Sequence, residues 1–503
     1  MRYRYNNRRT VTTLTGLVRL RLQIRRCENP GCTRCRMPYR PEAEGAIVLP
    51  QHEFGLDVIA LIGTWRYREH HSVPEIHRAL RQRGVVIAER TVTHLLDRYD
   101  ELVASTLTDN DRLRAILARQ GRVILALDGL QPDVGHEVLW VLRDCLSGEV
   151  LLARSLLSGT GADLAVLVRE VAANIGVPIT GVVSDGQQSV RLAVRQALPG
   201  VPHQLCQFHY LREAALPIFE ADRHAKKELK KQVRGVRPIE RAVEGRLDPE
   251  AEAVRGYCAA VRSAITDDGR PPLAASGLQL EARLVAVAAS LARGRHKGGL
   301  SRPLQRLRQL LARGLEHTQS MWPPIRRAYA WVHQAARILV NAAGESAETV
   351  RRRLDGLLGA MARHRTKAGP LAAAVEHFHK VTRSYRPGLF HCYAVADLPR
   401  SNNGLEQLFG SYRRHERRAT GRKANSSATV LRGSVRLLAG LATRLRRQDA
   451  SDLAAADRQR WRGVRARLER RRHARVLRAQ FRRDPKAYLS RLEQLLCQPV
   501  LPV

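Results

Sequence analysis

The chain has 503 residues, of which 44% are hydrophobic and 26% are charged. This is ordinary globular usage and excludes a wholly disordered or collagen-like chain; about three domains fit within this length. Because 86 Lys and Arg face 47 Asp and Glu, the formal net charge is +39. A chain with so much positive charge repels itself unless it meets a polyanion. We therefore expect nucleic acid as the partner, ahead of an anionic membrane surface.

The N-terminal residues are basic, but no apolar segment of a signal peptide follows them. No stretch approaches the roughly 20 apolar residues that a membrane-spanning helix requires. Three of the eight cysteines cluster and the other five are scattered, so reduced cysteines in a cytosolic protein are expected rather than a disulfide framework. These features predict a cytoplasmic, nucleoid-associated protein that does not enter a membrane.

The clustered cysteines lie in the segment 20–54, which is rich in turn-forming residues. Cys27, Cys32 and Cys35 have the spacing C-x4-C-x2-C, and three thiolates with one further ligand would form a tetrahedral structural zinc site. The candidates for that ligand are the downstream histidines His52, His70 and His71, and we favour His52. The alternative is that the three cysteines are unrelated reduced thiols.

The next segment, 55–115, has the pattern of short amphipathic helices. Ser72 and Glu75 have the spacing of a capping box, and apolar residues at helical spacing flank Gly84 on both sides. This arrangement is compatible with an ordinary helical hairpin. It also fits a helix-turn-helix, whose second helix would present four residues to the major groove: Arg90, Thr91, Thr93 and His94.

Residues 121–210 alternate strand-like and helical patterns. Arg122–Asp128 reads as a buried strand that ends on an acid, and Glu137–Asp144 and Glu149–Leu156 read as a hairpin. A helix then closes on Gly176, and a further strand ends on Asp185. A helix over Gln187–Ala197 and a strand over His203–Tyr210 complete the pattern. This order predicts an α/β domain in which helices flank a mixed sheet.

Asp128 and Asp185 each close an apolar strand. Asp128 and Asp185 are 57 residues apart, and open α/β sheets gather such strand ends at one edge, where their sites lie. Carboxylate oxygens are the ligands that Mg²⁺ prefers, and a pair of such ions stabilises in-line attack on a phosphodiester. The alternative is that each acid only caps the helix that follows it.

A third acid, Glu406, lies far downstream in the segment S-N-N-x-x-E. Asn402 or Asn403 can cap a helix whose first turn contains Glu406. Further along the same helix, the sequence predicts a basic face made by Arg413, Arg414, Arg417 and Arg418. A carboxylate beside such a basic face suits an enzyme that acts on phosphodiesters.

Together these motifs resemble a DDE-type insertion-sequence transposase of the mutator-like group, which has a ribonuclease H-like catalytic domain. The matching elements are LALDG at Asp128, VVSDG at Asp185, C-x-x-H at Cys206 and His209, and S-N-N-x-x-E at Glu406. The third acid lies 221 positions after the second, and this long gap resembles members that insert a helical domain there. The resemblance covers roughly residues 20–440.

The resemblance implies a catalytic triad of Asp128, Asp185 and Glu406 that binds two Mg²⁺ (or Mn²⁺) ions. The implied activity is DNA strand cleavage followed by strand transfer, without a covalent enzyme intermediate. The implied partners are double-stranded DNA, as terminal inverted repeats and target DNA, and further copies of the chain in a homo-oligomer. The alternatives are a catalytically idle, transposase-derived DNA-binding regulator and a ribonuclease H-like DNA nuclease.

Residues beside the triad are expected to support the active site. They are Cys206, His209 and Asn403. For the Cys206 and His209 pair, half a zinc site, a hydrogen-bonding buttress and a satisfied core pair all remain open.

The remaining sequence is helical and basic. Lys226, Lys227, Lys230 and Lys231 form either a solvated helix face or a contact to the phosphate backbone. Trp322 and Trp331 have helical spacing, which favours a core position over base stacking. Residues 411–490 contain 24 Lys and Arg against 6 Asp and Glu, and thus hold nearly half of the excess charge.

The expected organisation has five parts. They are a zinc-knuckle-like segment (20–54), a helix-turn-helix domain (55–115), a catalytic domain (120–215 with 391–440), a helical insertion (216–390) and an Arg-rich helical tail (441–503). We expect the tail to lie along DNA.

Overall fold

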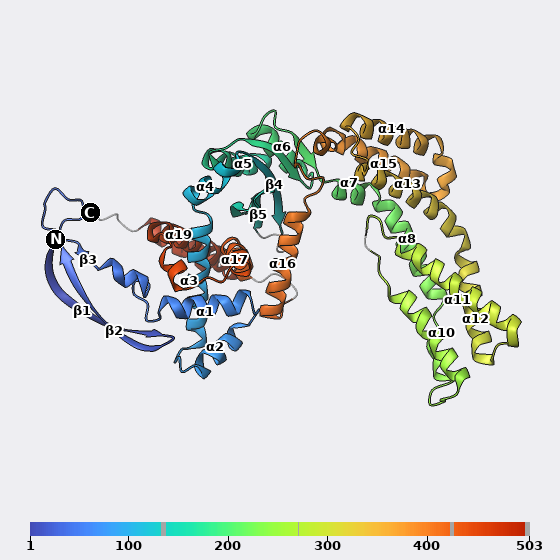
Figure 1. Cartoon of the computed structure of the whole chain (residues 1–503), viewed down its shortest axis with the longest axis horizontal. Helices are drawn as coiled ribbons and strands as arrows, with labels where there is room; N and C mark the ends of the chain where they lie inside the picture. The colour runs from blue at the N-terminus through green and yellow to red at the C-terminus, as the bar shows by residue number, and fades with distance from the viewer. Residues whose placement is uncertain (132–136, 270, 423–426, 498–503) are drawn as a thin grey trace. The chain divides into compact units, whose positions relative to one another are not determined.

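The computed structural model of the chain describes residues 1–131, 137–269, 271–422 and 427–497 (Figure 1). The chain divides into two compact units. Unit 1 comprises Met1–Thr180, Gln188–Gly200 and Asn403–Val503, and unit 2 comprises Gly181–Gln187 and Val201–Asn402. About 65% of the residues are helical and a mixed five-stranded sheet is present, which confirms the predicted α/β class.

Unit 1 begins with a long β-hairpin for which the sequence had suggested no structure. Strands β1 (Arg2–Thr13) and β2 (Gly16–Arg26) run side by side and antiparallel (Figure 1). The two-residue strand β3 (Pro38–Tyr39) pairs with the end of β2. Side chains alternate across the two faces of a strand, and the face that carries Val11, Leu22 and Ile24 is buried. We call this hairpin the β1–β2 ribbon.

The predicted short helices follow the ribbon. They are α1 (Leu56–Tyr67), α2 (Val73–Gln82), α3 (Glu89–Leu107) and α4 (Asn110–Gln120). The capping box predicted for α2 is present, because the Ser72 side chain accepts a hydrogen bond from Glu75 N and the Glu75 carboxylate accepts one from Ser72 N. Gly84 has a positive φ of 79° just beyond α2, a conformation that glycine adopts without steric cost.

The five-stranded sheet has the order β6-β5-β4-β7-β8. Its strands are β4 (Val123–Leu130), β5 (Val138–Asp144), β6 (Val150–Leu156), β7 (Ile179–Ser184) and β8 (His203–Leu205). Strands β4, β5 and β6 form an antiparallel meander, whereas β7 and β8 are parallel. The hairpin predicted from residues 137–156 is therefore confirmed. The boundary between the units falls within β7, after Thr180.

Two strand boundaries differ from the prediction. Strand β4 continues two residues beyond Asp128, because Leu130 is buried and pairs with Leu139 of β5. The strand predicted over His203–Tyr210 is too long, since β8 ends at Leu205 and a helix begins at Gln207. Tyr210, Leu211 and Ala214 are buried at helical spacing, and a short apolar run cannot distinguish this pattern from a strand.

Helices from distant parts of the sequence complete unit 1. Beside the sheet lie α5 (Gly161–Ile175), which ends at Gly176 as predicted, and α6 (Gln188–Ala197). The C-terminal part contributes α16 (Asn403–Thr420), α17 (Ser427–Leu445), α18 (Ala450–Ala454), α19 (Arg458–Arg483) and α20 (Pro485–Leu496). One hydrophobic core joins α1, α2 and α3 to α17, α18 and Trp461 of α19. The C-terminal helices are thus part of the core around the predicted helix-turn-helix.

Unit 2 is almost entirely helical and has a continuous hydrophobic core. Its helices are α7 (Gln207–Ala214), α8 (Leu216–Gln232), α9 (Val236–Arg241), α10 (Pro249–Thr266), α11 (Ser276–Gly298), α12 (Arg302–Thr318), α13 (Trp322–Val340), α14 (Ala347–Arg363) and α15 (Ala372–Tyr385). Short 3-10 segments are η1 (Glu42–Ala46) in unit 1 and η2 (Gln319–Met321), η3 (Arg365–Leu371), η4 (Arg386–Gly388) and η5 (His391–Tyr393) in unit 2. Among the described helices, none has both the length and the apolar character needed to span a bilayer.

Two tryptophans and one lysine of unit 2 lie in its core. Trp322 and Trp331 are buried, which confirms the core position. The solvated lysine face is only partly correct, because Lys226 is buried and its ammonium donates a 2.8 Å hydrogen bond to Asp268. This partner lies 42 residues further along the chain, so the local pattern could not reveal it.

Candidate functional site

Asp128 and Glu406 belong to elements that contact each other within unit 1. Asp128 lies on β4 opposite Val141 of β5, and its carboxylate accepts a 2.7 Å hydrogen bond from the backbone N–H of Gly129. Glu406 lies in the first turn of α16, as predicted, and α16 contacts β4. Both acids are half-buried. Carboxylates in a first turn are favoured by the helix dipole, so this position also stabilises α16.

Glycines allow close packing around these two acids. A Cβ at Gly129 would lie 2.9 Å from Val138 and 3.2 Å from the ring of Trp140. A Cβ at Gly404 would lie 3.0 Å from the guanidinium of Arg143 on β5. A side chain at position 129 would therefore crowd Val138 and Trp140, whereas at position 404 the neighbouring atom is the flexible end of Arg143, which can move aside.

Asp185 is the residue directly after β7 and belongs to unit 2. It is half-buried, and its carboxylate accepts a 3.0 Å hydrogen bond from the backbone N–H of Gln187. The Tyr385 hydroxyl lies 3.1 Å from the backbone oxygen of Asp185 and 2.9 Å from the carboxylate of Glu213. Since a hydroxyl has one proton to donate, it can serve one of these acceptors at a time. This tyrosine ties the loop after β7 to α15 and α7.

The residues predicted to support the active site lie at the start of α7 and of α16. Cys206 directly follows β8 as the N-cap of α7, and His209 lies in the first turn of this helix. The buried thiol of Cys206 accepts a 3.4 Å hydrogen bond from Asn402 N, and Gln207 N donates one of 3.0 Å to Arg400 O. These contacts lie within unit 2 and hold the segment that leads into α16. Asn403, the first residue of α16, is exposed.

The predicted basic face of α16 points toward solvent. Arg413, Arg414, Arg417 and Arg418 are all exposed. The opposite side of the helix carries Tyr412, His415 and Glu416, which are buried. The helix thus joins an acid in its first turn to a row of exposed guanidinium groups in its later turns.

The predicted DNA-binding residues lie in the first turns of α3. Arg90 and His94 are exposed, and Thr91 and Thr93 are half-buried. Val92, Leu95 and Leu96 occupy the buried side of the helix. The outward position is compatible with a recognition helix, and it is equally compatible with a helical hairpin.

The three clustered cysteines are brought together in one tight loop. Cys35 N donates a 2.8 Å hydrogen bond to Cys32 O, and Arg36 N donates one of 2.8 Å to Cys27 O. The imidazole of His52 contacts the backbone oxygen of Pro50 at 2.8 Å, and burial lowers its pKa. Within the described residues, no group of three or more His, Cys, Asp or Glu side chains is arranged to hold a metal ion. The zinc and magnesium sites therefore remain predictions from donor type and spacing.

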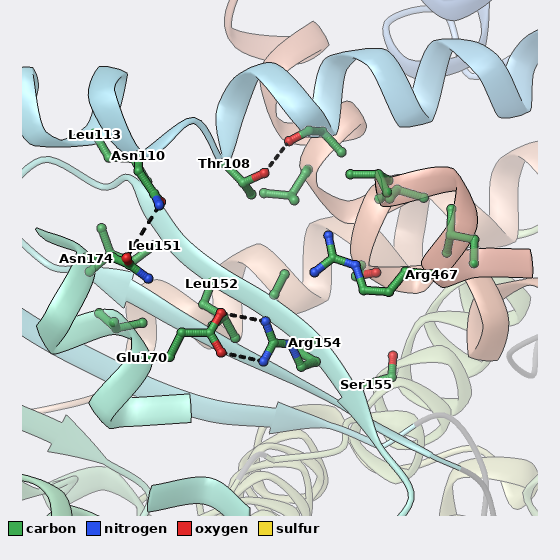
Figure 2. A pocket seen from close by; sticks show the side chains of 18 of the residues that line it. Thr108, Asn110, Leu113, Leu151, Leu152, Arg154, Ser155, Glu170, Asn174 and Arg467 are labelled. Carbon is green, nitrogen blue, oxygen red and sulfur yellow. Dashed lines mark hydrogen bonds and ion pairs between the residues drawn. The ribbon is translucent and has the colours of Figure 1, made fainter. Parts of the chain in front are cut away.

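A cavity of about 310 Å³ lies elsewhere in unit 1, between β6, α5, α17 and α19 (Figure 2). Arg154 on β6 forms a two-pronged ion pair with Glu170 on α5, at 2.5 and 2.6 Å, and Asn110 contacts Asn174 at 3.5 Å (Figure 2). Arg467 of α19 also lines the cavity. None of the predicted site residues lines it, so we assign the candidate site to the acids rather than to this cavity.

A buried charge network in unit 1 was not anticipated from the sequence. Glu101 of α3 accepts hydrogen bonds from Arg98 (2.7 Å), from Arg432 of α17 (3.0 Å) and from the indole of Trp461 (3.1 Å). Arg436 of α17 lies within 4.0 Å of Asp97, Asp100 and Glu416. The local signal was the i, i+4 spacing of Arg432 and Arg436, which places both guanidinium groups on one side of α17.

Comparison of the sequence with protein-family models and with curated proteins gives no match.

Proposed function

We propose that the chain is a DDE-type transposase, with a ribonuclease H-like catalytic domain, that cleaves and joins DNA at the ends of an insertion sequence. The observation that carries the proposal is the placement of three acids relative to the sheet. Asp128 lies on β4, Asp185 follows β7, the neighbour of β4 in strand order, and Glu406 begins a helix that contacts β4. Between the second and third acids lies the segment Val201–Asn402, which is largely helical and also contains β8.

The donor chemistry of these residues fits a divalent ion. Three carboxylates supply hard oxygen ligands of the kind that Mg²⁺ and Mn²⁺ require. Such ions, when bound, stabilise the charge that develops during phosphodiester attack. The chain itself contributes the three carboxylates as ligands. The four exposed arginines of α16 are the proposed contacts to the phosphate backbone near Glu406.

Duplex DNA is the proposed substrate and is bound at more than one place. The net charge of +39 provides long-range attraction for a polyanion. Arg90, Thr91, Thr93 and His94 on α3 are the proposed contacts to a terminal repeat. We propose that two copies or more assemble on DNA, because transposition must hold two DNA ends together. The cysteine loop is proposed as a zinc-stabilised part of the same DNA-binding region.

Strand cleavage by a charge-matched variant pair tests the triad. The full chain is incubated with Mg²⁺ or Mn²⁺ and a duplex that carries the inverted repeats flanking its gene. Asp185→Asn should lower the cleavage rate on the order of 100-fold or more, because several kcal/mol of transition-state stabilisation depend on the bound ions. The control Glu244→Gln removes one exposed carboxylate from unit 2 and should leave the rate unchanged.

The outcomes of this experiment separate the alternatives. Equal cleavage by the wild type and Asp185→Asn would contradict the triad. A wild type that binds the repeats tightly but never cuts them would favour the DNA-binding regulator. Cleavage of any duplex without strand transfer would favour the nuclease.

A further inference from the structure

The β1–β2 ribbon carries charged side chains of one sign only. Residues 1–26 contain eight arginines and no Asp or Glu. A strand pair with this composition is rare as a packing element, since Arg and Lys are seldom buried without partners. The arginines of the ribbon are divided between its two faces.

The inner face of the ribbon is packed, and Arg9 on this face is paired with a carboxylate. Val11, Leu22 and Ile24 are buried on this face. Arg9, which shares it, forms a 2.6 Å ion pair with the buried carboxylate of Glu44. Arg40 binds the same carboxylate at 2.7 Å and contributes most to lowering the pKa of Glu44. Apolar packing and the ion pairs of Glu44 therefore hold the inner face against the rest of unit 1.

The outer face is basic and exposed. The register pairs Arg8 with Arg21 and Thr10 with Arg19, and Arg25 lies further along on the same face. All four arginines are exposed, and among the described contacts none of them forms an ion pair. Asn6 and Gln23 oppose each other between Arg21 and Arg25, and Tyr3 opposes Arg25. This face thus combines guanidinium groups with amide side chains and carries no acid.

The ribbon is anchored at its turn. Thr12 N donates a 2.7 Å hydrogen bond to Glu53 O, and Gly55 N donates one of 2.9 Å to Thr12 O. The Asp57 carboxylate, in the first turn of α1, accepts a 2.7 Å hydrogen bond from Leu14 N. These bonds fix the outer face relative to the start of α1. A preorganised surface loses less conformational entropy when it binds.

We propose that the outer face of the β1–β2 ribbon enters the major groove of duplex DNA. The major groove admits a two-stranded β-ribbon. Residues two apart on a strand are about 6.8 Å apart, so Arg19 and Arg25 span about 20 Å, or about six base pairs at 3.4 Å each. Arginine pairs with guanine, and asparagine or glutamine with adenine, through two hydrogen bonds in this groove. The proposal rests on DNA as substrate and adds a second recognition element to α3.

Salt-dependent binding of the full chain to a mixed-sequence 24-base-pair duplex tests the proposal. Arg19→Gln/Arg21→Gln should weaken binding at least tenfold at about 100 mM salt. It should also lower the slope of log affinity against log salt concentration by about 1.8, if two phosphate contacts are lost. The matched control Arg306→Gln/Arg313→Gln removes two exposed arginines from α12 of unit 2 and should change neither quantity. Equal affinity and slope in the wild type and the ribbon variant would overturn the proposal.

Two further measurements decide the groove and the partner. Wild-type protein should protect guanine N7 atoms, which lie in the major groove, from methylation by dimethyl sulfate, and the ribbon variant should lose part of this protection. Duplex RNA has a deep, narrow major groove that side chains cannot read, so it should compete poorly. Protection that is unchanged in the ribbon variant, or equal competition by RNA, would overturn the major-groove assignment.

These tests are independent of the triad. Loss of binding in Arg19→Gln/Arg21→Gln together with equal cleavage by the wild type and Asp185→Asn would leave the ribbon proposal standing and the transposase proposal refuted. Cleavage that depends on Asp185, together with unchanged binding by the ribbon variant, would leave the transposase proposal standing and the ribbon proposal refuted.

Discussion

The hydroxyl of Tyr67 donates a 2.6 Å hydrogen bond to the carboxylate of Asp100, and both side chains are buried. The other oxygen of Asp100 lies 3.7 Å from the guanidinium of Arg436. These residues come from α1, α3 and α17, so a helix near the C-terminus completes the polar core of the N-terminal helices. Burial raises the pKa of Asp100 to about 7, although Arg436 and Arg432 oppose the shift.

Asp100 should make unit 1 less stable as the pH rises. A carboxyl whose pKa is about 7 in the folded chain and about 4 when unfolded binds more protons in the folded state between these values. Its contribution to stability is therefore complete below about pH 4 and decreases up to about pH 7. Asp100→Asn should remove this decrease, so that its melting temperature relative to the wild type rises from pH 4.5 to pH 7.5. A difference that is constant over this range would contradict the prediction.

His415 should have the opposite effect. Burial, together with Arg66, His70, Arg444 and Arg436, lowers the pKa of its imidazole to about 2. The folded chain then binds fewer protons than the unfolded chain below about pH 6.5, so stability decreases as the pH falls below that value.

The variant His415→Phe isolates this contribution. Phenylalanine keeps the ring contact with Tyr67, whose centroid lies 5.0 Å away, but loses the 2.9 Å hydrogen bond to His70. Its melting temperature should fall less than that of the wild type between pH 7 and pH 5. With His415 replaced, the decrease in stability with rising pH that Asp100 causes should become visible. A dependence of melting temperature on pH equal to that of the wild type would refute the role of this histidine.

Close packing of α1 on α3 gives a prediction about stability alone. A Cβ at Gly63 would lie 2.2 Å from the ring of Tyr99, so Gly63→Ala should force the two helices apart at a cost of about 1–3 kcal/mol. Gly410 of α16 is exposed and has no atom within 4 Å of such a Cβ. Gly410→Ala should stabilise the protein by about 0.5–1 kcal/mol. Thermal unfolding of both variants measures the difference between them. Equal shifts of the melting temperature would contradict the close packing of α1 on α3.

The cysteine loop is tested by metal analysis. We expect about one zinc ion per purified chain, and Cys32→Ser should abolish it, because a structural site needs all of its thiolate ligands. Cys497→Ser removes an exposed cysteine outside the loop and should leave the zinc content unchanged. A wild-type chain without zinc would refute the site, and zinc retained by Cys32→Ser would exclude Cys32 as a ligand.

Local patterns predicted the meander and α5, because each is bounded by turn or capping residues such as Gly148 and Gly176. The β1–β2 ribbon was missed because its alternating arginines hide the apolar period of Val11, Leu22 and Ile24. The helical start of α7 was missed because the short segment Leu205–Tyr210 fits the hydrophobic period of a strand as well as that of a helix. For the candidate site, the order of the motifs predicted the three acids, and Glu406 lies in the first turn of α16 as expected. The arginine and carboxylate pairs of α3 and α17 depend on contacts across more than 300 residues, which no local pattern contains.

Cys206 should act as a positioning residue for the segment that leads into α16. Its thiol accepts the hydrogen bond from Asn402 N, and a buried amide without an acceptor costs about 1–3 kcal/mol. Cys206→Val should therefore speed hydrogen exchange at Asn402, and Cys206→Ser should restore protection because its hydroxyl keeps an acceptor at this position. Cys258→Val, in the core of unit 2, should not affect this amide. If Cys206 acts only through packing, the valine and serine variants should exchange equally. If it also orients Glu406, Cys206→Val should lower the cleavage rate without weakening DNA binding.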